Sequence, residues 1–278
     1  MKGNNKKLYI IIILLCLVIA GLVIYIINIK KTFNNNNDFN PTPTPQNVEV
    51  LPKDTIISKA EYMLDNLLGT SVSDSWFYTF VRGYKGSIND IPNQTKLQMV
   101  YWMLKDGKDN KEFEDLTSDD ILSYFRDLFG SDYNITFEDI KVLDDDSITS
   151  WKYNKTTKTF EDSGTGRGSD YDFVRIVKSK FVKYNEVEKG KYVLTFKQLF
   201  NSYQESEDNK NCYVFTNFEG KKLFTKDCNL YEESTEQYKH NIDNVVKNEL
   251  SKYENELIEV DYTFEIENGD LVLKSINY

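Results

Sequence analysis

Histidine and cysteine are scarce in this sequence, which has one histidine and three cysteines among 278 residues. A serine or cysteine nucleophile needs an activating base, and histidine is the usual one. His240 lies in a charged segment with no serine or cysteine at an evident distance, so we interpret it as a solvated helix residue. The sequence therefore shows no evident pairing of a nucleophile with an activating histidine.

The sequence also lacks the spacing of known metal and phosphate motifs. Its acidic runs, such as residues 144–146, do not follow the Asp-x-Asp-x-Asp-Gly pattern of a calcium loop. No histidine or third cysteine lies near Cys212 and Cys228 to complete a zinc site. The glycine-rich segment 164–168 lacks the Gly-Lys-Ser/Thr of a P-loop. We therefore predict no metal site and no cofactor.

Positive charge is in the minority, with 34 Lys and Arg against 44 Asp and Glu and a net charge of −10. The acidic excess lies in residues 52–278, because the N-terminal part is net positive. Such a domain repels the phosphates of nucleic acids. We expect no nucleic-acid partner, and a partner selected by charge should be cationic or bridged by a metal.

The longest apolar run, residues 8–27, contains no charged side chain. Roughly 20 helical residues cross the ~30 Å hydrocarbon core of a bilayer. Three lysines precede the run and two follow it, a bias that places the N-terminus in the cytoplasm. We predict a cytoplasmic tail at residues 1–7 and a transmembrane signal-anchor helix at 8–28. The lipid bilayer is thus a partner, although a cleaved signal peptide stays an alternative.

A change of composition follows the apolar run. Residues 29–53 are rich in asparagine and in alternating proline and threonine, which is typical of a flexible linker. Residues 54–278 should form an extracytoplasmic domain, in which helical periodicity comes first and strand alternation afterwards. The patterns predict helices at 54–68, 94–105, 117–129 and 234–253, and strands near 135–142, 148–153, 157–161, 171–184 and 192–199.

Two hairpins complete the predicted domain. Cys212 and Cys228 lie symmetrically about Gly220, so a loop of residues 219–221 would place them opposite each other and would allow a disulfide. Asn268-Gly269 is a type I′ turn signal that would pair Ile266 with Leu271.

The closing segment, Tyr-Thr-Phe-Glu at 262–265 and Leu-Val-Leu-Lys-Ser-Ile at 271–276, resembles the terminal hairpin of NTF2-like and cystatin-like domains. The whole chain is similar to single-pass, extracytoplasmic envelope proteins of low-GC bacteria, a group from which no activity carries over. This resemblance and the element order imply an α+β fold with helices packed on a curved antiparallel sheet.

These observations favour a binding role over catalysis. Carboxylates are abundant but no pair stands out, so we assign no catalytic residue and predict that the chain is not an enzyme. We expect a membrane-tethered extracytoplasmic interaction or ligand-binding module of the cell envelope, with an envelope protein or a glycan as partner. Two alternatives stay open, namely an envelope glycan or peptide hydrolase that uses carboxylates and a structural subunit of an envelope complex.

The disulfide is directly testable. Digestion of the unreduced protein should yield peptides joined through Cys212 and Cys228, while Cys16 reacts as a free thiol. Replacing Cys212 by serine should lower the free energy of unfolding by about 3 kcal/mol, because the closed loop of roughly 15 residues restricts the unfolded chain. Mass mapping and urea unfolding measure the two effects. Alkylation of both Cys212 and Cys228 in the unreduced protein would contradict the pairing.

Overall fold

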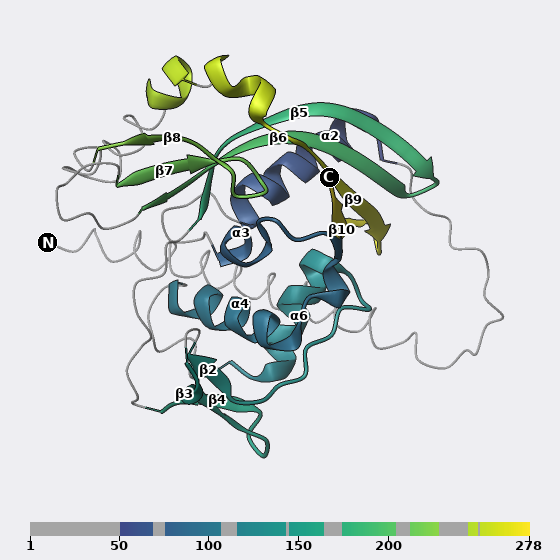
Figure 1. Cartoon of the computed structure of the whole chain (residues 1–278). Coiled ribbons are helices and arrows are strands. Elements are labelled where there is room, and N and C mark those ends of the chain that lie inside the picture. Colours follow the sequence, from purple (N-terminus) through teal and green to yellow (C-terminus); the bar gives the residue numbers. More distant parts are fainter. Residues whose placement is uncertain are drawn as a thin grey trace, which may run out of the picture. The chain divides into compact units, whose positions relative to one another are not determined.

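A computed structural model of the chain describes a discontinuous set of residues, which belong to a unit that runs from Val48 to Tyr278 (Figure 1). The described residues are 51–68, 76–106, 116–142, 145–163, 174–203, 212–227, 244–249 and 251–278. The transmembrane helix predicted at 8–28 lies outside them. Within these ranges, no helix is both long enough and apolar enough to cross a membrane.

The first described helix, α2, runs from Lys53 to Tyr62 and continues as a π-helical turn, Met63–Leu67. This confirms the helix predicted at 54–68. Ile56, Ala60 and Leu64 recur every four residues and are fully buried, so they form the side of the helix that enters the core. The π-helical geometry of the last turn has no signature in the sequence that we recognised.

The best delimited helix is α6, which runs from Ser118 to Phe129 and was predicted within a residue. Its start is a capping box, in which the Thr117 hydroxyl accepts from the Asp120 amide at 3.3 Å and the Asp120 carboxylate accepts from the Thr117 amide at 2.9 Å. Gly130 ends the helix with a φ of +99°, a conformation that glycine adopts readily.

Among the described residues, two further α-helices lie between α2 and α6 in the sequence. Helix α4, Asn93–Asp106, confirms the helix predicted at 94–105. Helix α3, Trp76–Val81, was not predicted, because six residues are too few to display a helical period. Its Phe77, Tyr78 and Val81 are nevertheless fully buried. Within the described residues four α-helices precede β2, one more than the three helices predicted before the first strand.

Among the described residues the main sheet has seven strands, and β6 is bonded along both of its edges. Strand β5 follows one edge, and the other edge is shared by β9, near the start of β6, and β7, near its end. Strands β10 and β1 extend the sheet beyond β9, and β8 extends it beyond β7. The strands are β1 (Gly86–Ser87), β5 (Arg175–Glu188), β6 (Lys191–Tyr203), β7 (Tyr213–Thr216), β8 (Lys222–Lys226), β9 (Glu259–Glu267) and β10 (Asp270–Asn277).

The terminal hairpin has the predicted register. Ile266 lies opposite Leu271, and Phe264 lies opposite Leu273. Asn268 and Gly269 both have positive φ, +53° and +89°, as a type I′ turn requires. The local turn signal and the alternation of apolar residues agreed here, so the sequence alone was sufficient to predict the register of this hairpin.

The β7–β8 hairpin was predicted, but its loop lies one residue earlier than expected. Asn217 donates to Lys221 at 3.1 Å and closes the loop 218–220, in which Gly220 has a φ of +85°. Tyr213 pairs with Lys226, so the continued register brings Asp227, not Cys228, opposite Cys212. Cys212 is disulfide-bonded. Cys228 lies outside the described residues, and its pairing with Cys212 stays a prediction.

The strands predicted between residues 135 and 161 form a second sheet, separate from the main one. Its order is β2 (Ile140–Val142), β3 (Asp145–Asn154) and β4 (Thr159–Asp162). The expectation of one curved sheet is corrected accordingly. The buried Ile140 and Phe160 of this second sheet nevertheless belong to the main hydrophobic core. Alternation marks a segment as a strand but does not say which strand will be its neighbour.

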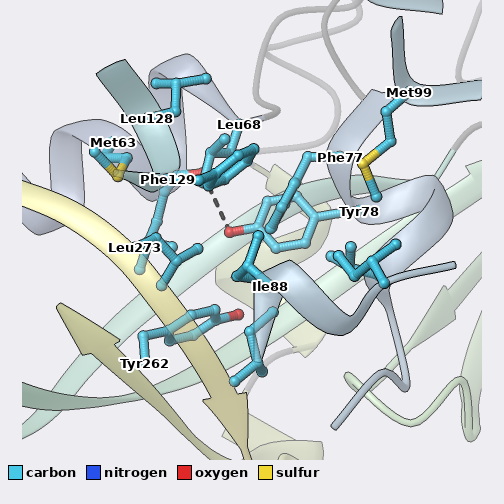
Figure 2. Packing of buried hydrophobic residues seen from close by; sticks show 14 of the residues in the cluster. Met63, Leu68, Phe77, Tyr78, Ile88, Met99, Leu128, Phe129, Tyr262 and Leu273 are labelled. Atoms are coloured by element: carbon cyan, nitrogen blue, oxygen red, sulfur yellow. Dashed lines mark hydrogen bonds between the residues drawn. The ribbon is translucent and has the colours of Figure 1, made fainter. Parts of the chain in front are cut away.

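The described unit is therefore an α+β structure with antiparallel sheets and few helices. Figure 1 shows β5 and β6 as a long arched pair with α2 and α3 on the inner side of the arch. Helices and strands share one core there, in which the Tyr78 hydroxyl donates to the Leu64 carbonyl at 3.2 Å (Figure 2). A second cluster on the opposite face of β6 joins Leu199 to Val246. Val246 belongs to the helical residues 244–249, which with 251–253 are the described part of the helix predicted at 234–253.

Gly130→Ala should be clearly more destabilising than Gly269→Ala. Both glycines have positive φ, but a Cβ at Gly130 would overlap the Lys274 ammonium and approach Glu267, whereas nothing lies within 4 Å of Gly269. We expect a loss of about 2–3 kcal/mol at Gly130 and about 1 kcal/mol at Gly269. Urea unfolding of both variants beside the unaltered chain measures the difference, and equal losses would contradict the ion-pair cluster around Lys274.

Candidate binding groove

An open groove of about 910 Å³ lies between α2, α6 and the start of β10. Helix α2 and the residue that follows it supply one side, α6 the other, and the tip of the β9–β10 hairpin one part of the wall. Its described lining residues are Asp54, Thr55, Ser58, Lys59, Tyr62, Met63, Tyr124, Asp127, Leu128, Asp270 and Leu271. The volume lies in the range of pockets that hold small molecules or short peptides.

The floor of the groove is apolar. Met63, Leu128 and Leu271 each expose 5% or less of their surface and reach the groove from three different elements. Figure 2 shows Met63 and Leu128 at the side of the core where Phe129 and Leu273 also lie. Because these side chains are held by the core packing, the floor is preformed.

Two tyrosines stand on the walls of the groove, one on each helix. Tyr62 from α2 is 59% exposed and Tyr124 from α6 is 41% exposed. Tyr62 lies on the side of α2 opposite the buried Ala60, whereas Tyr124 lies at the margin of the buried stripe of α6, next to Leu128. Exposed aromatic rings beside an apolar floor are typical of binding surfaces.

The groove carries more negative than positive charge. Asp54 and Asp127 lie on opposite walls, and among the described residues no cation forms an ion pair with either. Lys59 lies 3.7 Å from Asp270 at the hairpin tip, and both side chains are well exposed, so this pair contributes little to stability. The net charge of these four groups is negative, and the groove suits a cationic ligand better than an anionic one.

A partly buried carboxylate lies in the π-helical turn that follows Tyr62. Desolvation raises the pKa of Asp65 from 3.8 to about 6, the neighbouring Glu61 adds to the rise, and Lys178 of β5 opposes it. One oxygen of the Asp65 carboxylate is buried, and within the described part of the chain it has no hydrogen-bond partner. Single π-helical turns are frequent at functional sites, and this one places Met63 in the groove floor.

Behind Asp65, three buried polar side chains form a hydrogen-bonded chain. Gln198 donates to the Tyr78 hydroxyl at 3.4 Å and accepts a bond from the Tyr262 hydroxyl. Burial raises the pKa of both tyrosines, so they stay neutral donors. These residues join α3, β6 and β9, and their bonds satisfy groups that would otherwise be costly to bury.

The sequence did not single out the groove residues. Its one site prediction was the disulfide at Cys212 and Cys228, and Cys212 packs in the second cluster and does not line the groove. His240 and the segment 164–168 lie outside the described residues. A tyrosine outside the apolar stripe of each of two predicted helices was the signal available at Tyr62 and Tyr124, but only the fold shows that both helices line one groove.

Comparisons with protein families, with curated proteins and with solved structures find no match to this chain. Across the ranges that the structure describes, no three His, Cys, Asp or Glu side chains gather as metal ligands would. The chemistry of the groove therefore has to be read from its own residues.

Asp65→Asn should stabilise the protein at neutral pH. The folded state holds the Asp65 proton more tightly than the unfolded state, so stability falls as pH rises from about 4 to 6 and the full cost is present above pH 6. The neutral amide avoids that cost, and we expect a gain of about 1–2 kcal/mol at pH 7.5 that vanishes near pH 4. Urea unfolding at both pH values measures it. A less stable variant at pH 7.5 would show that the carboxylate makes a stabilising contact.

Proposed function

We propose that this chain is a membrane-tethered extracytoplasmic binding module of the cell envelope and that the groove between α2 and α6 holds its ligand. The observation that carries the proposal is the groove itself, with an apolar floor and an exposed tyrosine on each wall. A surface without a binding role rarely keeps two large exposed rings over a preformed apolar floor.

The tether is proposed from the sequence. The uncharged run at 8–28 and the linker at 29–53 precede α2, and α2 supplies one wall of the groove. The N-terminus would lie in the cytoplasm and the groove outside it. The arched sheet with helices on its inner side also supports, as a proposal, the NTF2-like or cystatin-like arrangement that the closing hairpin resembles.

Photocrosslinking in cells tests the groove. Benzoylphenylalanine in place of Tyr62 or Tyr124 should give a common adduct with an envelope component after irradiation, because both rings face the same ligand. Tyr203 is a matched control, since it is 43% exposed and belongs to β6 rather than to the groove. Adducts at Tyr203 equal to those at Tyr62, or no adduct at either groove position, would contradict the proposal.

Fractionation and protease digestion of the same cells test the proposed membrane tether. The full chain should sediment with membranes and be digested by protease added outside intact protoplasts, whereas a chain without residues 8–28 should be released from the membrane fraction. Protection of the full chain from external protease would reverse the proposed orientation.

A further inference from the structure

We propose that the α2–α6 groove binds a basic peptide segment, one that presents lysine or arginine side chains beside small apolar ones. The inference rests on the proposed function and names the ligand class of the same groove. It follows from where the charges, the rings and the apolar floor lie relative to one another.

The charges on the walls select a cation. Asp54 stands in the first turn of α2 and Asp127 stands on α6, so a ligand in the groove passes between two carboxylates. In the described part of the chain neither is neutralised by an ion pair, while Lys59 is engaged with Asp270. An anionic ligand would be repelled by both walls, and the acidic excess of residues 52–278 adds to that repulsion at longer range.

The rings and the floor suit the rest of a basic side chain. Lysine and arginine place a charged head on an apolar stem, and the stem can lie on Met63, Leu128 and Leu271 while the head meets a carboxylate or a tyrosine ring. The fold already uses this contact elsewhere, since Lys53 lies 5.2 Å from the ring centre of Tyr184 and Lys96 lies 4.8 Å from that of Tyr133.

The size and openness of the groove favour a segment of chain over a single amine. Its volume of about 910 Å³ exceeds what one side chain fills, and basic groups spaced along a peptide can reach both walls at once. A neutral sugar could stack on the tyrosines, but it would leave Asp54 and Asp127 without a countercharge.

Fluorescence anisotropy with the full chain in a neutral detergent tests the proposal. The probe is a short labelled peptide of repeating Lys-Ala-Ser units, beside matched peptides with glutamine or glutamate in place of lysine. The lysine peptide should bind best and weaken with added salt. Asp54→Asn and Asp127→Asn should each weaken it about threefold, and together about tenfold.

Glu186→Gln is the matched control, because it removes one exposed carboxylate from β5, away from the groove, and should leave the affinity unchanged. Unchanged thermal unfolding of each variant shows that the fold is intact. Equal affinity for the glutamine peptide, equal loss in Glu186→Gln, or binding of a neutral N-acetylglucosamine oligomer in place of the lysine peptide would each overturn the proposal. If these tests fail while Tyr62 and Tyr124 still give their common crosslink, the ligand class is wrong but the binding groove stands.

Discussion

The backbone hydrogen bonds of β6 are the constraint on which the described structure depends. Every N–H and C=O in a buried strand needs a partner, and β6 finds partners along both edges, from β5 on one side and from β9 and β7 on the other. Because two different strands share the second edge, β6 holds together two branches of the sheet. The burial of both faces near its end, with Phe200 in one cluster and Leu199 in the other, follows from that position.

The groove is a consequence of how the helices attach to one of these branches. The end of α6 is tied to the terminal hairpin because Ser131 donates to Glu267 at 2.7 Å and Lys274 pairs with both Glu267 and Asp132. The other wall, α2, lies on the inner side of the arch and reaches the same hairpin through Lys59 and Asp270. The hairpin thus contacts two helices that are about 60 residues apart in the sequence.

The polar groups of the core and those of the groove differ in their partners, which are other side chains in the core and water in the groove. Tyr78, Gln198 and Tyr262 satisfy one another inside the core, where an unpaired group would cost stability. Asp54 and Asp127 stay exposed, and no described cation pairs with them. Water solvates these carboxylates, so leaving them without a countercharge costs little stability. Asp65 lies between these extremes in a π-helical turn next to the groove, and its raised pKa reflects the cost of keeping a carboxylate half-buried there. The half-buried carboxylate of Asp65 and the exposed carboxylates of Asp54 and Asp127 thus lie on, or directly after, the helices that line the groove.

The sequence by itself determined the elements whose signals are local. The helices predicted at 54–68 and 117–129 and the turn at Asn268 each depend on residues close together in the sequence, and the structure has them as expected. Only the tertiary structure decided the short helix α3, the separate sheet β2–β4 and the one-residue shift in the β7–β8 loop, because these depend on which distant segments pair. The groove belongs to the second kind, since Tyr62 and Tyr124 are ordinary helix residues until packing on β10 brings them to one cavity.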